Sequence, residues 1–369
     1  MRMKNPWLDI NQYTENLHNY YKGRDTECKN FADIIIEDTL SVVYANSGVG
    51  KSSFLNAGII PQLKERGLHI SPIQIVFDDE FFNQKEDVEK FVLNKLNKNL
   101  QWTSCLKNEV KELKQSLWWR LHAYRPYSDR KKTIPVFIFD QFEEVFVKGD
   151  SQLHEKFFSL IEELSFHSLP SIVNQTLTKS YDDTLSELDN SHNYRIIFSL
   201  RKEYLADFDH WTNERFSIPQ LLRNRMLLLP FTVKQAEEVI CKQPLVDESG
   251  QIVEGCYLET LSQVRGEIIS KLDPYGKGYI EPSLLSVLCY RLFEKCKNNP
   301  QKSITLDELK AIDTDKVLRI FYESQLQEVL RSRKKMYVLE TSLVNSKGIR
   351  NRPQVRELEK KGLDRKSVV

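Results

Sequence analysis

Five short runs of apolar residues, rich in β-branched and aromatic side chains, recur along the chain. They are TLSVVYA (39–45), PIQIVF (72–77), PVFIFD (135–140), YRIIFSL (194–200) and RMLLLP (225–230). Strands that are apolar on both faces belong in a parallel sheet that is covered by helices on each side. Between the second and third runs, apolar residues recur at helical spacing from Val88 to Leu100 and again from Val110 to Leu121. This alternation predicts an α/β fold with a doubly wound parallel sheet.

After Pro230 the strand pattern gives way to helical patterns. Apolar residues recur at helical spacing in TVKQAEEVICKQP (232–244), CYLETLSQVRGEIISKL (256–272) and PSLLSVLCYRLFEKC (282–296). We therefore expect a parallel-sheet domain over residues 1–231, a helical lid domain over 232–305 and a third part over 306–369. Ser, Thr, Asp and Asn are frequent in residues 171–193, which predicts a solvated loop before the fourth strand.

Composition excludes several classes of protein. The chain carries 53 Lys and Arg against 52 Asp and Glu, so no overall field favours a nucleic acid or a membrane as partner. Residues 331–369 differ, with 12 basic against 4 acidic side chains. The six cysteines form no C-x-x-C pair, which argues against a zinc site or a disulfide framework. The N-terminus lacks the apolar core of a signal peptide, and no run approaches the ~18 apolar residues of a membrane span. We therefore expect a reduced, cytoplasmic protein.

The segment YANSGVGKSSFLNAG (44–58) is close to the phosphate-loop pattern G-x-x-x-x-G-K-[ST], with Ala45 in place of the first glycine. In such a loop, successive backbone N–H groups surround a phosphate at the positive end of the following helix. The first position only shapes the exit from the strand, so alanine is acceptable there if its φ is negative. A strand pattern precedes the loop and a helical pattern follows it. The alternative is a glycine-rich loop without a ligand.

The loop predicts a specific role for each polar position. Its expected nucleotide-binding residues are Ser47, Gly48, Val49, Gly50, Lys51, Ser52 and Ser53. Gly48 and Gly50 stand where side chains would collide with phosphate oxygens. Lys51 would reach the β- and γ-phosphates, the Ser52 hydroxyl would bind Mg²⁺, and the Ser53 N–H would hold the α-phosphate.

Carboxylates follow the third predicted strand in PVFIFDQFEEVF (135–146). Asp140 stands where a phosphate-loop protein places the acid that holds Mg²⁺. Glu143 or Glu144 would orient or deprotonate an attacking water. The alternative for all three acids is that they cap the next helix at its positive end.

A cation ends the fourth predicted strand. Arg201, in FSLRKEYL, would lie at the carboxyl edge of the sheet, where it could sense a γ-phosphate. Its alternative is a surface ion pair with Glu203 or another neighbour. The predicted catalytic residues are therefore Lys51, Glu143, Glu144 and Arg201.

These segments resemble the STAND class of P-loop NTPases, and in particular its bacterial branch with a DQFEE box. GRDTE (23–27), LLLPFTVKQAEEVI (227–240) and IEPSLLSVLCYRL (280–292) carry the same resemblance, which extends over roughly residues 5–360. It implies that Gly23 and Arg24 belong to an N-terminal box over the nucleotide. It also implies that Pro282 packs on the base, although Ile280 replaces a usual glycine.

The resemblance assigns further roles at the sheet edge. Asp140 matches the magnesium acid, Glu143 and Glu144 match catalytic carboxylates, and Arg201 matches a sensor arginine. Gln141 stands at a position that is acidic in many ring ATPases, so slow ATP turnover is implied.

The function implied by the resemblance is a molecular switch that binds ATP or ADP with Mg²⁺. ADP would hold the nucleotide, helical and winged-helix domains together, and exchange for ATP would open the chain for self-association. Residues 306–369 would be the first part of a winged-helix domain, with sensor and effector regions outside this sequence. By analogy, the switch would act in bacterial antiviral defence. Two other hypotheses stay open: an ATP-dependent DNA-binding regulator that uses the basic C-terminal region, and a nucleotide-binding scaffold without turnover.

Overall fold

The computed structural model describes most of the chain up to residue 296. The described residues are 3–9, 11–78, 81–82, 87–106, 110–165, 170–177, 188, 193–244, 246–247, 256–273, 275–296, 309 and 342. Apart from residues 309 and 342, the expected winged-helix part over 306–369 lies outside them.

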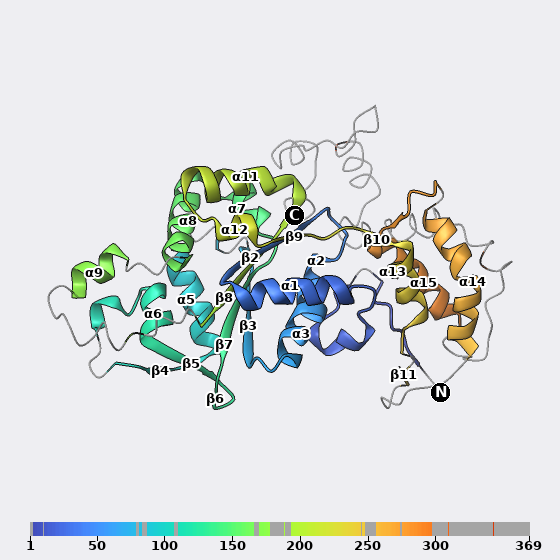
Figure 1. Cartoon of the computed structure of the whole chain (residues 1–369), viewed down its shortest axis with the longest axis horizontal. Helices are drawn as coiled ribbons and strands as arrows, with labels where there is room; N and C mark the ends of the chain where they lie inside the picture. Colours follow the sequence, from blue (N-terminus) through green and yellow to red (C-terminus); the bar gives the residue numbers. More distant parts are fainter. Residues whose placement is uncertain are drawn as a thin grey trace.

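A five-stranded parallel sheet forms the centre of the molecule (Figure 1). Its order is β3-β7-β8-β2-β9, so that β8 lies between β2 and β7. The strands are β2 (Leu40–Ala45), β3 (Ile70–Ile75), β7 (Ile134–Phe139), β8 (Arg195–Arg201) and β9 (Arg225–Leu227). The parallel α/β core expected from the five apolar runs is therefore confirmed.

Helices cover both faces of this sheet. One face packs on α1 (Asp25–Glu37), α2 (Lys51–Ser53), the π-helical turn η2 (Phe54–Ile59) and α3 (Ile60–Glu65). The other packs on α5 (Val88–Asn99), α6 (Leu117–Ala123), α7 (Glu143–Lys148), α8 (Ser151–Ser165) and α11 (Leu205–Asp209). Alternate residues of a strand point to opposite faces. In β7, accordingly, Val136 and Ile138 join the first core, whereas Phe137 and Phe139 join the second.

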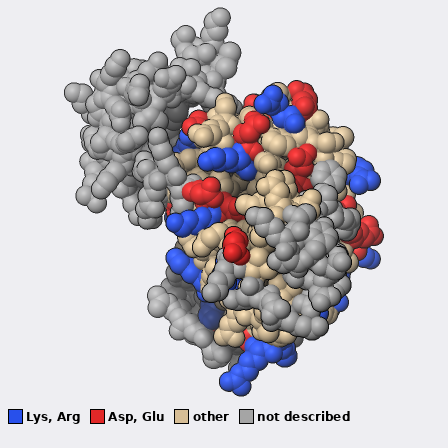
Figure 2. Space-filling view, turned by 90° about the vertical axis from the view of Figure 1, so that its left-hand side faces the viewer, with Lys and Arg blue, Asp and Glu red and all other residues tan. Residues whose placement is uncertain are grey.

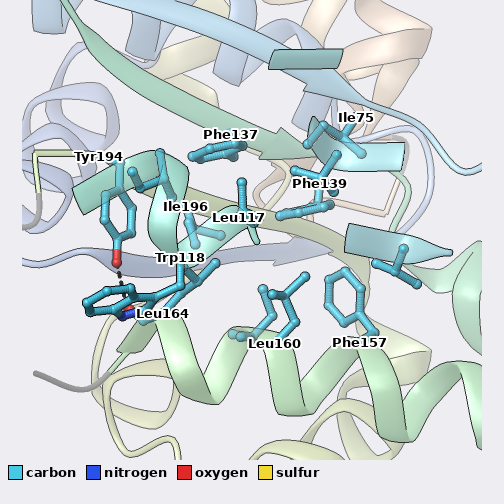
Figure 3. Close-up of a cluster of buried hydrophobic side chains, with 14 of the residues drawn as sticks. Ile75, Leu117, Trp118, Phe137, Phe139, Phe157, Leu160, Leu164, Tyr194 and Ile196 are labelled. Carbon is cyan, nitrogen blue, oxygen red and sulfur yellow. Dashed lines mark hydrogen bonds between the residues drawn. The ribbon is translucent and has the colours of Figure 1, made fainter. Parts of the chain in front are cut away.

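The second core is rich in aromatic rings. Phe157 and Leu160 of α8 point toward Phe139 of the sheet (Figure 3). At its other end the Tyr194 hydroxyl donates to the Leu164 carbonyl, 2.7 Å away, so the one polar atom of that ring is satisfied inside the core. The same core also includes Leu221 of α12 (Gln220–Arg223), and Tyr204 of η4 (Lys202–Tyr204) and Trp211 of η5 (His210–Arg215) pack against it.

The segment of the chain that connects α5 to β7 forms a small antiparallel sheet, although the sequence predicted only helices there. Its strands are β4 (Gln101–Ser104), β5 (Tyr124–Ser128) and β6 (Lys131–Lys132). The apolar pattern from Val110 to Leu121 forms η3 (Lys111–Leu113) and then α6. The Ser116 hydroxyl starts α6 by accepting the Trp119 N–H at 3.3 Å.

The prediction of a loop over residues 171–193 is wrong for the beginning of this segment. Residues Ser171–Leu177 form helix α9, and the rest of the segment lies largely outside the described residues. Val173 of this helix is fully buried, so tertiary packing stabilises a segment whose local composition favours a loop.

Three helices form a separate core at one end of the molecule, on the right in Figure 1. They are α13 (Val233–Cys241), α14 (Cys256–Leu272) and α15 (Pro282–Cys296). Two short strand pairs, which the helical pattern did not predict, accompany them: β10 (Phe231–Thr232) with β12 (Tyr279–Ile280), and β1 (Met3–Lys4) with β11 (Val246–Asp247). The fully buried Trp7 belongs to this core, so the N-terminal segment packs with helices that follow it by more than 200 residues in sequence.

Candidate functional site

The predicted phosphate loop connects β2 to α2 at the carboxyl edge of the sheet. Gly48 and Gly50 have φ values of 83° and 93°, a left-handed conformation that favours glycine. Ala45 is the buried last residue of β2 and keeps the extended conformation of that strand, so alanine fits there without strain. Ser47 is exposed and Ser52 lies in the first turn of the following helix.

Lys51 lies among the charged residues predicted for the site. Burial lowers the pKa of Lys51 below its usual value, and the carboxylates of Glu143 and Asp140 oppose this shift, whereas Arg201 adds to it. All three groups are therefore within electrostatic reach of the Lys51 ammonium. The charge is desolvated yet compensated by acids, an arrangement that suits a lysine that contacts phosphate oxygens.

A tight turn places the acids at this edge. Gln141 follows β7 with a φ of 56°, a left-handed conformation that is uncommon for a residue other than glycine. Its N–H donates to Asp140 Oδ1 at 3.0 Å, and the Phe142 N–H donates to the Ser199 carbonyl of β8 at 2.9 Å. The turn is thus tied to the neighbouring strand, and α7 begins directly after it at Glu143.

Glu143 and Arg201 form an ion pair across the sheet edge. Arg201 Nε lies 2.9 Å from Glu143 Oε1, and the Arg201 backbone N–H donates to Oε2 at 3.2 Å. The Glu143 side chain is 5% exposed and that of Arg201 is 38% exposed. Arg201 also pairs in register with Ala45 of β2, so the pair lies beside the start of the phosphate loop. The ion pair expected as the alternative for Arg201 therefore exists, but its partner is a residue of the site.

Glu144 differs from its neighbour. Its carboxylate lies 3.1 Å from the Lys148 ammonium, one turn further along α7. The structure therefore brings together Lys51, Asp140, Glu143 and Arg201 and directs the Glu144 carboxylate to another partner.

One cavity is lined by the phosphate loop together with elements that lie far away in the sequence. The lining includes Gly48 to Gly50 and Ser53 of the loop, Pro282 and Ser283 of α15, and several residues from the N-terminal segment. A Cβ atom at Gly48 would lie 3.4 Å from Ser283 Oγ, and the Tyr13 N–H donates to Ser53 Oγ at 3.1 Å. The first turn of α15 and the N-terminal segment therefore lie directly against the loop.

Gly23 and Arg24 occupy a junction beside this cavity. Arg24 is 1% exposed, donates to the Leu229 carbonyl at 2.7 Å and lies 4.4 Å from the centre of the Phe231 ring. A Cβ atom at Gly23 would lie 2.8 Å from the Gln235 carbonyl oxygen, so only glycine fits there. The resemblance placed these two residues over the nucleotide. In the structure they join α1 to the chain that enters α13, and the adjacent Tyr21 and Lys22 line the cavity instead.

A protein-family model described as Novel STAND NTPase 1 matches residues 6–314. The chain belongs to this family. It is therefore a nucleotide-binding P-loop protein, as its loop and DQFEE segment predicted. No curated protein matches the sequence of this STAND NTPase.

Several solved structures are similar to this STAND NTPase in fold at low sequence identity. The ORC1 protein of Aeropyrum pernix, solved in complex with DNA, has 12% identity and a TM-score of 0.48, and the match covers 92% of this chain and 76% of that one. The ADP form of the ORC2 protein of Aeropyrum pernix has 10% identity and a TM-score of 0.49, with coverages of 98% and 89%. A Walker-type ATPase of Pyrococcus abyssi has 14% identity and a TM-score of 0.46, with coverages of 96% and 91%.

Several cavity residues of this STAND NTPase that the sequence did not single out lie in its N-terminal segment or directly follow α13. Trp7, Asp9, Tyr13 and Gln243 line the cavity. No local pattern could have identified them, because they reach the loop only through tertiary packing. None of the helices in the described part of the chain is long and apolar enough to cross a membrane.

Proposed function

We propose that this STAND NTPase is an ATP-dependent molecular switch that binds ATP or ADP in the phosphate loop and hydrolyses ATP slowly. The observation that supports this proposal best is the shared cavity, which is lined by the loop and by the first turn of α15. A nucleotide bound there would contact both the sheet and the helical core. If ATP and ADP differ in affinity for two arrangements of these parts, exchange of one for the other shifts the equilibrium between them.

The donor set fits a nucleotide with Mg²⁺. The left-handed Gly48 and Gly50 leave backbone N–H groups free of neighbouring Cβ atoms, and Lys51 supplies a desolvated cation. Ser52 and Asp140 would hold Mg²⁺, and the described residues contain no cluster of three or more potential metal-binding side chains. That agrees with the way proteins bind this ion, through one or two side chains together with phosphates and water. The bound ion would neutralise charge on the phosphates.

Hydrolysis requires a rearrangement of the Glu143–Arg201 pair. Arg201 contacts both carboxylate oxygens of Glu143, Oε1 through its guanidinium and Oε2 through its backbone N–H, so the guanidinium competes with a water molecule for Oε1. The side chain of Arg201 is partly exposed, and the γ-phosphate of ATP would compete for its guanidinium. Transfer of the Arg201 guanidinium to the phosphate would free Oε1 of Glu143 to orient and deprotonate the water that attacks the γ-phosphorus. The products are ADP and inorganic phosphate, and the step that breaks the ion pair accounts for slow turnover.

The wider role of the switch follows by analogy with other members of the STAND class. We include in the proposal self-association of the opened chain and a role in bacterial antiviral defence. Domain closure over ADP by residues 232–305, and by a winged-helix part over 306–369, also belongs to the proposal.

The mechanism is tested by single-turnover release of phosphate from ATP. We expect slow release from the wild type, loss of release in Glu143→Gln, and near wild-type release in Glu144→Gln, because the Glu144 carboxylate contacts Lys148. Loss in Glu144→Gln with retention in Glu143→Gln would contradict the assignment. No release from the wild type over hours would favour a scaffold without turnover.

The DNA-binding alternative rests on residues 331–369 and stays a prediction, because these residues, apart from residue 342, lie outside the described part of the chain. On the face shown in Figure 2, acidic and basic side chains are interspersed, with a small basic group at the lower end. Exposed Arg130 in the β5–β6 turn is followed by exposed Lys131 and Lys132 of β6. Three adjacent cations do not make the extended basic surface of a DNA-binding protein.

A further inference from the structure

The cavity beside the phosphate loop contains polar atoms that lack partners among the described residues. Much of its wall is apolar or aromatic, including Trp7, Phe231 and Val239. Among its polar residues, Gln243 and Asp9 each contribute an acceptor atom, Oε1 and Oδ1, that is buried without a hydrogen bond. A buried acceptor without a donor destabilises the folded chain, so two in one cavity suggest that a ligand supplies the donors.

The orientation of the Gln243 amide is fixed by its other end. Gln243 is 2% exposed, and its Nε2 donates to the Tyr20 carbonyl at 3.0 Å. A carbonyl oxygen only accepts, so the NH₂ group must face Tyr20 and Oε1 must point elsewhere. The acceptor is therefore held in place before any ligand binds, which lowers the entropic cost of recognition.

Asp9 adds a second acceptor to the cavity. Its φ is 61°, a left-handed conformation that aspartate adopts more often than most residues other than glycine, and burial raises the pKa of its carboxyl group, an effect that Arg291 opposes. A carboxylate repels phosphate, so Asp9 marks a part of the cavity that suits the uncharged base or ribose of a nucleotide rather than its phosphates.

We infer that Gln243 selects adenine nucleotides, with its Oε1 accepting a hydrogen bond from the 6-amino group of the base and Asp9 as a second acceptor. This inference rests on the proposed function, since it requires a nucleotide in the cavity. Adenine carries a donor at carbon 6, whereas hypoxanthine and guanine carry a carbonyl oxygen there. Two acceptors would then face each other, and a site built to bind an N–H group rejects such an analogue strongly.

The chain offers a matched control. Gln220 of α12 also has a buried Oε1 without a partner, and its Nε2 donates to a backbone carbonyl, that of Ser165. It does not line the cavity. Gln243→Leu and Gln220→Leu therefore remove the same chemical group, one inside the proposed base pocket and one at a half-buried position outside it.

The experiment compares equilibrium binding of ATP, ITP, GTP and 2′-deoxy-ATP to the wild type and both variants by calorimetry, with thermal unfolding to verify that each variant is folded. We expect the wild type to prefer ATP over ITP and GTP by about tenfold or more, because one buried hydrogen bond is at stake. Gln243→Leu should reduce this preference to less than about threefold, and Gln220→Leu should retain it. If Gln243→Leu does not fold, the test uses the nucleotide preference of the wild type together with that of Gln243→Met.

Several results would overturn the inference. Equal binding of ATP and ITP by the wild type, or tighter binding of GTP, would do so while leaving the switch intact. Discrimination only against 2′-deoxy-ATP would assign Gln243 to the ribose instead. Loss of the preference in Gln220→Leu would reveal an indirect effect. If no nucleotide binds the wild type at all, the proposed function fails together with this inference.

Discussion

Replacement of Gly50 by alanine tests whether the loop after β2 accommodates a phosphate group. Gly50 has a φ of 93°, and a Cβ atom added there would meet no heavy atom of the chain within 4 Å. Gly67, at the end of α3, is a matched control, with a φ of 80° and equally free space around the added atom. Of these two glycines, only Gly50 lines the cavity.

The magnitudes follow from this geometry. A left-handed alanine costs about 1–2 kcal/mol, and the reduced freedom of the unfolded chain offsets about 0.4–1 kcal/mol of that. Both variants should therefore lose about 1 kcal/mol of unfolding free energy. In Gly50→Ala the new methyl group also occupies space that a phosphate needs, so ATP affinity should fall at least about tenfold, or about 1.4 kcal/mol.

The assay is urea denaturation for stability and calorimetric titration of Mg·ATP for binding, on both variants and the wild type. We expect equal stability losses and a binding loss confined to Gly50→Ala. Equal ATP affinity in the two variants would refute the assignment of this loop as the phosphate site.

Three further predictions concern stability and are measured by urea denaturation. Arg24→Met should cost about 2–3 kcal/mol, because it removes the hydrogen bond to the Leu229 carbonyl and the stacking on Phe231; a cost near zero would contradict this role. Burial raises the pKa of the Cys28 thiol from 9.0 to about 12, so the unfolded chain loses its proton first and stability falls as the pH rises between these values. The stability of the wild type relative to Cys28→Ala should therefore decrease between pH 7.5 and about 10, whereas a constant difference would refute the burial effect. Gly58→Ala should cost about 1–3 kcal/mol, because its Cβ atom would lie 2.5 Å from Cys28 Sγ, and adding Cys28→Ala should recover part of that cost.

The sequence predicted the central sheet well because its strands are apolar on both faces and appear as continuous runs. The antiparallel sheet was missed for the opposite reason. β4 is short and alternates between exposed and half-buried residues, and β5 contains Pro126, which is unfavourable inside most strands. Helix α9 was missed because it depends on the burial of Val173, which no local pattern reveals.

Part of the candidate site could likewise be predicted from the sequence, and part of it could not. The loop and Asp140 could be predicted because each lies in a contiguous motif next to a strand end. Glu143 and Glu144 could not be distinguished, because both are acidic and adjacent, and only the packed helix shows which one contacts Arg201. Gln243 was missed because its contact with Tyr20 joins residues 223 positions apart.

The proposed switch is tested most directly by hydrogen exchange of the backbone amides in the phosphate loop and in the first turns of α15, measured without nucleotide, with ADP and with Mg·ATP. Both nucleotides should protect the loop. ADP should also protect the start of α15, where Ser283 lies against Gly48, and ATP should leave this region exchanging faster than ADP does. Equal protection of α15 by the two nucleotides would contradict a switch based on closure of the helical core over the loop.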